Sequence, residues 1–185
     1  MIYLAGPLFN DGERQEMALL AAALEKVGLN TFLPQRDGLE LDSLRQIEPG
    51  ASALWASAIF RLDMAHVLAS RGMVVNLDGR VPDEGAMVEA GVAWATGKPV
   101  VLYQRDARRC FDGDNNPMIS RLSLHPPASE PMQAAQLMAT LLKDWDERQA
   151  RVSRLALGTH LPHWEALRQL PASQQLHAIS QWLDH

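Results

Sequence analysis

Short apolar runs alternate along this chain with longer segments of helical periodicity, and this alternation restricts the folds that it can adopt. The apolar runs lie at residues 2–5, 31–33, 73–77 and 99–103. The segments with helical periodicity lie at residues 13–27, 51–69, 84–96 and 132–149. Strands that alternate with helices form a parallel sheet that is covered by helices on both faces. The sequence therefore predicts an α/β fold.

Within this class, we predict a flavodoxin-like, doubly wound and mainly parallel sheet of four to five strands with helices on both faces. Residues 104–129 are expected to form an irregular loop, in which a fifth strand is placed near residues 119–124. Residues 1–150 are predicted to form the α/β domain, and residues 151–185 a C-terminal helical extension of the same domain. A chain of 185 residues is long enough for one well-packed domain.

Composition and charge exclude several classes of partner. The chain has a formal net charge of −5 and no cluster of Lys and Arg for a phosphate backbone, so no nucleic-acid partner is expected. No apolar run approaches the roughly 20 residues that cross a bilayer, so no membrane partner is expected either. The lone Cys110 has no internal disulfide partner, and the first residues lack the features of a secretory signal. We therefore expect a cytoplasmic protein.

The sequence also lacks the usual motifs for metals and cofactors. The six histidines show no metal-ligand spacing, and neither a Gly-x-Gly-x-x-Gly nor a Gly-x-x-x-x-Gly-Lys motif occurs. We accordingly expect no metal site and no organic cofactor.

The predicted fold indicates where a ligand would bind. In doubly wound sheets, ligands lie outside the carboxyl ends of the strands, at the point where the strand order reverses. This rule selects residues 3–9, 78–85 and 104–116 as the segments that form the site. In these segments, Gly6, Phe9 and Gly85 are expected to bind the substrate.

Glu89 is the most unusual residue of the helix that is predicted after the third strand. It is the only charged residue between Gly85 and Gly97, in a segment that is otherwise apolar or small. A buried carboxylate without partners costs several kcal/mol, so such a residue is usually paired, protonated or functional. The alternative is a glutamate that faces solvent. Gly85 and Gly91 favour a functional role, because they leave room beside the carboxylate for a bound ring.

Two aspartates lie near the same junction of strand and helix. Asp78 directly follows the third strand, and Asp83 precedes the helix that carries Glu89. Each has an ordinary structural explanation, because aspartates commonly form turns and cap helices. Three acidic groups at one sheet edge nevertheless suit glycosidic bond cleavage, which uses one ionised and one protonated carboxyl group. Tyr3 points either into the core or at the mouth of this cleft.

An ordered set of short motifs resembles the nucleoside 2-deoxyribosyltransferases over about residues 1–145. The motifs are Tyr3 to Phe9, Asn76-Leu77-Asp78, Pro82-Asp83-Glu84-Gly85 with Glu89 and Gly91, and Asn116-Pro117-Met118. The order and spacing of the set carry the resemblance, and no single motif does so alone. The resemblance implies transfer of a 2-deoxyribosyl group from a 2-deoxynucleoside to an acceptor nucleobase, without a cofactor.

The resemblance also implies roles for individual residues. Glu89 matches the nucleophile that attacks the anomeric carbon, and Tyr3 matches a hydroxyl group that orients this carboxylate. Asp78 and Asp83 match positions that hold the base, and Asp83 would protonate the base as it leaves.

The implied chemistry is a double displacement. Attack by Glu89 releases the first base and leaves a glycosyl ester, which a second base attacks, so configuration is retained and the kinetics are ping-pong. Glu89 must then be ionised at neutral pH, whereas Asp83 must hold a proton. Asn116 and Met118 match a segment that touches the sugar in a neighbouring subunit's site, so a homo-oligomer is implied.

Two other functions remain open. The first is that of a related hydrolase, an N-glycosidase that cleaves 2-deoxynucleoside 5-monophosphates, in which water replaces the acceptor base. Such enzymes carry a Gly-rich loop with Ser and Arg after the first strand, whereas this chain has Gly-Pro-Leu-Phe-Asn-Asp, whose Asp11 would repel a phosphate. The second is that of a module that senses a nucleoside and does no chemistry.

Overall fold

The sheet of this protein has four parallel strands in the order β2-β1-β3-β4. The structure is a computed structural model that describes residues 1–39, 44–46, 50–108, 114–160 and 166–180. The strands are β1 (Ile2–Ala5), β2 (Thr31–Phe32), β3 (Gly72–Asn76) and β4 (Val100–Tyr103). Each strand agrees with a predicted apolar run to within one residue at either end, so the predicted α/β sheet is confirmed. Cys110 lies outside the described residues.

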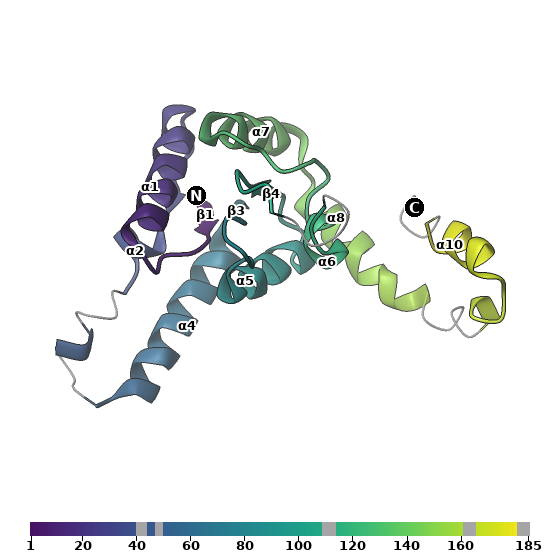
Figure 1. Cartoon of the computed structure of the whole chain (residues 1–185), viewed down its shortest axis with the longest axis horizontal. Coiled ribbons are helices and arrows are strands. Elements are labelled where there is room, and N and C mark those ends of the chain that lie inside the picture. The colour runs from purple at the N-terminus through teal and green to yellow at the C-terminus, as the bar shows by residue number, and fades with distance from the viewer. Residues whose placement is uncertain (40–43, 47–49, 109–113, 161–165, 181–185) are drawn as a thin grey trace.

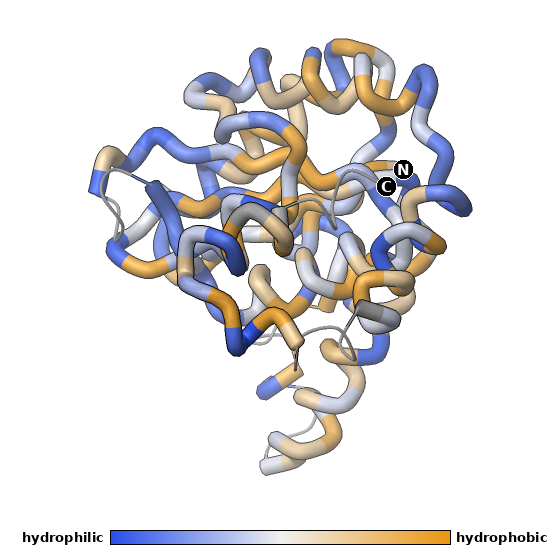
Figure 2. Tube along the Cα trace, turned by 90° about the vertical axis from the view of Figure 1, so that its right-hand side faces the viewer, coloured by the Kyte–Doolittle hydropathy of each residue, from blue (hydrophilic) through white to orange (hydrophobic). Residues whose placement is uncertain are grey.

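Helices cover both faces of the sheet, as Figure 1 shows. They are α1 (Asp11–Lys26), α2 (Pro34–Asp37), α4 (Ser52–Ala69), α5 (Glu84–Ala95), α6 (Pro117–Ser120), α7 (Pro131–Asp144), α8 (Glu147–Ala156), the 3-10 helix η1 (Leu157–His160) and α10 (Ala172–Ser180). Helices α1 and α7 pack together on one face, and α4 and α5 pack on the other. Hydrophobic residues therefore run through the middle of the molecule (Figure 2), and β1, β3 and β4 are buried along their whole length.

The strand order reverses between β1 and β3. The chain leaves β1 through α1 on one face of the sheet, whereas it leaves β3 through α5 on the other face. The register pairs Ala5 with Val75 near the carboxyl ends of these two strands. The two connections diverge from this edge, and the pocket described below lies between them.

Local signals fix the chain around this edge. Asn10 begins α1 with a capping box, in which its side chain accepts from the Glu13 amide and its own amide donates to the Glu13 carboxylate. Gly6 brings the loop after β1 close to its neighbours, because a Cβ at this position would lie 2.8 Å from both Asn76 Cβ and Met17 Sδ. The narrow space explains why only glycine fits there.

Two sequence-based expectations are wrong. Residues 119–124 form no strand but continue from α6 into a turn, and the end of β4 instead pairs with Ala128 through an isolated bridge at Tyr103. The segment 132–149 is not one helix, because it breaks at Trp145 between α7 and α8. The backbone of Trp145 is extended, and its indole N–H donates a hydrogen bond to the Gly97 carbonyl at 2.7 Å. This hydrogen bond holds the chain in place between the two helices.

Helix α8 packs against the end of α5 that is farther from the pocket. Arg154 donates hydrogen bonds to the carbonyl oxygens of Trp94 and Lys98, and its guanidinium group lies over the rings of Trp94 and Trp145. Figure 1 shows α8 leading away from the sheet, with α10 beyond it. Within the described residues, no helix has both the length and the apolar character needed to span a bilayer.

Candidate active site

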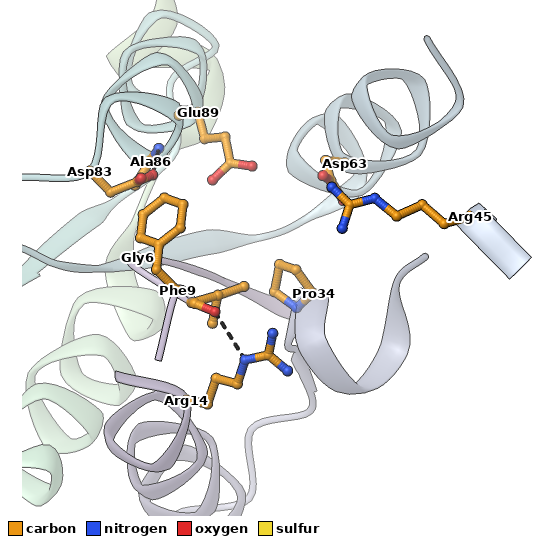
Figure 3. Close-up of a pocket in the computed structure, with 11 residues that line it drawn as sticks. Gly6, Phe9, Arg14, Pro34, Arg45, Asp63, Asp83, Ala86 and Glu89 are labelled. Carbon is orange, nitrogen blue, oxygen red and sulfur yellow. Dashed lines mark hydrogen bonds between the residues drawn. The ribbon is translucent and has the colours of Figure 1, made fainter. Parts of the chain in front are cut away.

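A pocket of about 530 Å³ opens at the carboxyl edge of the sheet, where the strand order reverses. Figure 3 shows several of the side chains that surround it. The pocket is lined by Gly6, Leu8, Phe9, Arg14, Pro34, Arg45, Asp63, Asp83, Gly85, Ala86 and Glu89. This volume lies in the range of small-molecule sites. The pocket lies where the rule used to choose the site segments places a ligand, and its lining includes Gly6, Phe9, Asp83, Gly85 and Glu89. No described residue of the segment 104–116 lines it.

Glu89 and Tyr3 meet in the wall of this pocket. The Tyr3 hydroxyl group donates a hydrogen bond to Glu89 Oε1 at 2.6 Å, although 86 positions separate the two residues. Tyr3 is completely buried in β1, and Glu89 is half-buried on α5. Both open interpretations of Tyr3 therefore hold in part, because its ring packs in the core while its hydroxyl group reaches the site.

The protonation of Glu89 is shifted by its surroundings. Its pKa is raised to about 7. Burial is the largest cause, the hydrogen bond from Tyr3 lowers the pKa, and the charges of Asp63 and Asp83 raise it. Burial and the Glu89 carboxylate also raise the pKa of the Tyr3 hydroxyl group well above its usual value, so this group stays a donor. Attack at neutral pH requires ionised Glu89, and this pKa places the titration of its carboxyl group in the neutral range.

Asp83 lies beside Glu89 and caps the helix that carries it. Its Oδ1 accepts a hydrogen bond from the Ala86 amide at 2.7 Å, so the structural explanation considered for this residue is correct. The same residue lines the pocket. Gly85 lies next to it, where an added Cβ would come within 3.3 Å of Asp83 Oδ1. By contrast, an added Cβ at Gly91 would meet no atom within 4 Å, apart from its neighbours in the helix.

Asp63 is a pocket residue that the sequence analysis did not select. It extends from α4, on the same face of the sheet as α5, and lies opposite Asp83 across the pocket (Figure 3). Burial raises its pKa, and the nearby His66 lowers it. Asp63 is the only acidic residue of the otherwise mostly apolar α4. The reasoning that selected Glu89 would have found it.

Two arginines also line the pocket, Arg14 from α1 and Arg45 from the segment before α4. Arg14 Nε donates to the Leu8 carbonyl at 2.9 Å, and the Arg14 carbonyl accepts from Gln35 Nε2 at 2.7 Å. The sequence analysis expected the acidic Asp11 to repel a phosphate here. Among the described residues that line the pocket, however, the first turns of α1 contribute Arg14 and not Asp11. The groups from α1 that line the pocket are therefore basic and not acidic.

Asp78 lies at the carboxyl end of β3 but is not one of the described residues that line the pocket. Its Oδ1 accepts hydrogen bonds from the backbone amides of Arg105 at 2.6 Å and Asp106 at 2.8 Å. These contacts tie the connection after β3 to the loop after β4. The role of Asp78 in binding the base stays a prediction, and the structure shows only that backbone donors engage one of its carboxylate oxygens.

The Asn116 segment and Phe9 are strongly exposed. Asn116 caps α6 by accepting from the Met118 amide at 2.9 Å, and Met118 is 81% exposed. Neither residue belongs to the described lining of the pocket in its own chain. Phe9 is also 81% exposed, and its ring stands at the pocket below Glu89 in Figure 3.

The described residues hold no group of three or more His, Cys, Asp or Glu side chains arranged for a metal ion. The pocket instead combines three carboxyl groups with a tyrosine hydroxyl group and two arginines. Such a set can supply a carboxylate nucleophile, a proton donor and hydrogen-bond donors to a ligand.

Comparison with known proteins connects this site to a family. The family model described as nucleoside 2-deoxyribosyltransferase matches residues 2–125, which include β1 to β4 and all of the described residues that line the pocket. The chain belongs to this family. Nucleoside 2-deoxyribosyltransferases and their relatives transfer or hydrolyse N-glycosidic groups, so the chain is an enzyme of this broad kind.

Solved structures of similar fold agree with this assignment. A conserved protein from Enterococcus faecalis V583 has 24% identity and a TM-score of 0.60, over 75% of this chain and 96% of its own. A 2-deoxyribosyltransferase from Bacillus psychrosaccharolyticus has 23% identity and a TM-score of 0.58, over 80% of this chain and 94% of its own. A comparison with curated protein sequences finds no match. At these identities the two structures establish a common fold.

Proposed function

We propose that this nucleoside 2-deoxyribosyltransferase family member moves the 2-deoxyribosyl group of a 2-deoxynucleoside to an acceptor nucleobase, with Glu89 as nucleophile. One observation carries the proposal, namely that the half-buried carboxylate of Glu89 lines the pocket while the Tyr3 hydroxyl group holds one of its oxygens at 2.6 Å. Family membership and the likeness to a 2-deoxyribosyltransferase from Bacillus psychrosaccharolyticus support the reaction class.

In the first step, a carboxylate oxygen of Glu89 attacks the anomeric carbon. A carbon–oxygen bond forms, the carbon–nitrogen bond to the base breaks, and the base leaves with the electron pair of that bond. Tyr3 keeps the carboxylate in position by donating to Oε1, and Oε2 has no hydrogen-bond partner within the described part of the chain. We assign Oε2 as the attacking atom, because its lone pairs are not engaged.

In the second step, a nitrogen of the acceptor base attacks the same carbon and displaces Glu89, and the proton of that nitrogen passes to the carboxylate that protonated the first base. The two displacements each invert the anomeric centre, so the product keeps the configuration of the donor. The released carboxylate is the group that began the cycle. No metal or organic cofactor enters this sequence of bond changes.

Two aspartates on either side of Glu89 are candidates to protonate the leaving base. Asp83 was expected to take this role, but one of its oxygens accepts from the Ala86 amide. Burial raises the pKa of Asp63, which favours a proton on this carboxyl group. We therefore assign the proton donor to Asp63 and the positioning of the sugar to Asp83.

The exposed segment with Asn116 and Met118 supports an oligomeric enzyme. These two residues are solvent-exposed and lie outside the described lining of their own pocket. We propose that they reach the sugar in the pocket of a neighbouring subunit. We also propose that residues 1–150 form the catalytic domain, that residues 151–185 extend it, and that the enzyme serves cytoplasmic nucleotide salvage.

The experiment that tests this function measures the release of free base from 2-deoxynucleosides with and without an acceptor base. Turnover that depends on the acceptor base, with formation of the exchanged nucleoside, supports transfer. Rapid release of base without an acceptor, above all from a 2-deoxynucleoside 5-monophosphate, identifies an N-glycosidase instead.

A 2-fluoro-2-deoxynucleoside distinguishes an enzyme from a sensor. The fluorine atom disfavours positive charge at the neighbouring carbon, so the glycosyl ester on Glu89 should accumulate and raise the protein mass by the mass of the fluorinated sugar. Peptide mapping should place the adduct on Glu89, and Glu89→Gln should form none. Binding without an adduct would support a nucleoside sensor.

A further inference from the structure

Arg14 and Glu89 lie on opposite sides of the pocket. Figure 3 shows Glu89 descending from α5 on one side and the guanidinium group of Arg14 rising from α1 on the other, next to Pro34. Both line the same cavity of about 530 Å³. A ligand that fills the cavity therefore contacts both residues.

This arrangement places the leaving base near Arg14. In a displacement at the anomeric carbon, the bond that breaks lies on the far side of that carbon from the attacking oxygen. If Glu89 attacks from the α5 side, as the proposed function requires, the base projects toward α1. Pro34 and Arg14 line that side of the cavity.

Arg14 is fixed at one end and able to donate at the other. Its Nε donates to the Leu8 carbonyl at 2.9 Å, which holds the side chain against the loop after β1. Its two terminal nitrogens have no hydrogen-bond partner within the described residues. A guanidinium group donates and cannot accept, so its partner on a ligand must be an acceptor atom.

We propose that Arg14 is a specificity-determining residue that donates to the carbonyl oxygen at position 6 of a leaving purine or position 4 of a leaving pyrimidine, so that the site selects bases with an oxo group there over bases with an amino group there. This inference rests on the proposed function, because it takes the position of the base from attack by Glu89. Hypoxanthine and adenine differ at position 6, which carries an oxygen acceptor in the first and an amino donor in the second. With adenine, the guanidinium group of Arg14 would face the amino group at position 6, and neither donor could accept a hydrogen bond from the other.

The same contact assists departure of the base. The electron pair of the breaking carbon–nitrogen bond moves onto the base, and in an oxo base the negative charge spreads to the carbonyl oxygen. A fixed guanidinium group beside that oxygen stabilises the charge as it develops. Arg14 therefore affects kcat as well as KM for oxo bases.

The test compares Arg14→Met, Arg14→Lys and the wild-type enzyme on matched donors with one acceptor base in excess. The donor pairs are deoxyinosine with deoxyadenosine, and deoxyuridine with deoxycytidine. Arg14→Met should lower kcat/KM for each oxo donor about 10-fold or more and for each amino donor less than about 3-fold. Arg14→Lys should recover part of the loss. Lys26→Met, at the exposed opposite end of α1, is the matched control and should leave all four values unchanged.

Equal losses on oxo and amino donors would overturn the inference, because they would mean that Arg14 only holds the loop at Leu8. The 5-monophosphates of the same four donors are measured alongside, and losses confined to them would overturn the inference as well and make Arg14 a phosphate ligand. Calorimetric binding of free hypoxanthine and adenine separates this inference from the proposed function, because it needs no turnover. Wild type should bind hypoxanthine about 10-fold more tightly, and Arg14→Met should remove the difference.

Discussion

The hydroxyl group of Tyr3, on β1, donates a 2.6 Å hydrogen bond to the carboxylate of Glu89, on α5, and so joins two elements that diverge at the carboxyl edge of the sheet. This bond opposes burial, which raises the pKa of Glu89 to about 7. Under the proposed function, the fraction of Glu89 that can attack a sugar therefore depends on pH in the neutral range. Tyr3 acts on that fraction as well as on the position of the carboxylate.

We expect kcat/KM to rise with pH through an apparent pKa near 7, because only ionised Glu89 is nucleophilic. Tyr3→Phe removes the hydrogen bond that lowers this pKa. In this variant, the rise of kcat/KM with pH should therefore occur about one pH unit higher. The loss of activity in Tyr3→Phe should be larger at pH 6 than at pH 9. A pH profile of both enzymes checks this, and a loss that is the same at all pH values would limit Tyr3 to a steric role.

The stability of the protein should also report the ionisation of Glu89. Its pKa is about 7 in the folded protein and 4.5 in the unfolded chain, so protonated Glu89 favours the folded state. This contribution is present below pH 4.5 and is lost as the pH rises through 7. Glu89→Gln carries no such charge. We compare the free energy of unfolding of Glu89→Gln with that of wild type at pH 5 and at pH 8. The value for the variant minus the value for wild type should be larger at pH 8, by at most about 3 kcal/mol.

Urea unfolding of wild type and Glu89→Gln at the two pH values measures this difference. Other titrating groups are present in both proteins and largely cancel in the comparison. A difference that does not change with pH would mean that Glu89 has an ordinary pKa in the folded protein. Glu89→Gln should in addition lose at least about 1,000-fold of turnover, because an amide cannot serve as the nucleophile.

The sequence was sufficient to predict the sheet and the position of Glu89, because both depend on local patterns. Apolar runs in a parallel sheet are buried on both faces, and a single carboxylate in an apolar helix is conspicuous. The direction of a side chain at the sheet edge is not local. Asp78 follows β3 as predicted, but the amides that hold it belong to residues 27 and 28 positions later.

Asp63 could have been selected by the same local pattern as Glu89, because it is the only acidic residue of the mostly apolar α4. Arg14 could not, because it lies on a helix with exposed polar neighbours, and only the packing of α1 on the sheet turns its side chain toward the pocket. A tertiary arrangement of this kind has no periodic pattern in the sequence. The break at Trp145 is similar, because the carbonyl of Gly97 that binds its indole lies 48 positions earlier.

The two aspartates in the pocket should have different effects when they are neutralised. Asp63→Asn removes the group to which we assign proton donation, so kcat should fall most for donors with poor leaving groups. Asp83→Asn should keep the helix cap, because asparagine is an equally good N-cap residue, and stability should change by less than about 0.5 kcal/mol. Its kcat should fall to a similar extent for all bases. Values of kcat for donors with a series of leaving groups decide between the two assignments. If kcat depends more strongly on the leaving group in Asp83→Asn than in Asp63→Asn, Asp83 is the proton donor and the two assignments are exchanged.

Two glycines offer a test of how α8 is attached to the helix that carries Glu89. Gly97 ends α5 with a φ of 91°, and Gly28 ends α1 with a φ of 82°, so alanine is strained at both positions by about 1 kcal/mol. At Gly28 an added Cβ meets no atom within 4 Å, whereas at Gly97 it would lie 2.2 Å from the Glu147 carbonyl oxygen. Gly97→Ala must therefore also push α8 away from α5. We expect it to cost about 3 kcal/mol or more in urea unfolding, against about 1 kcal/mol for Gly28→Ala. Equal costs would mean that α8 moves freely at this contact and does not support the helix that carries Glu89.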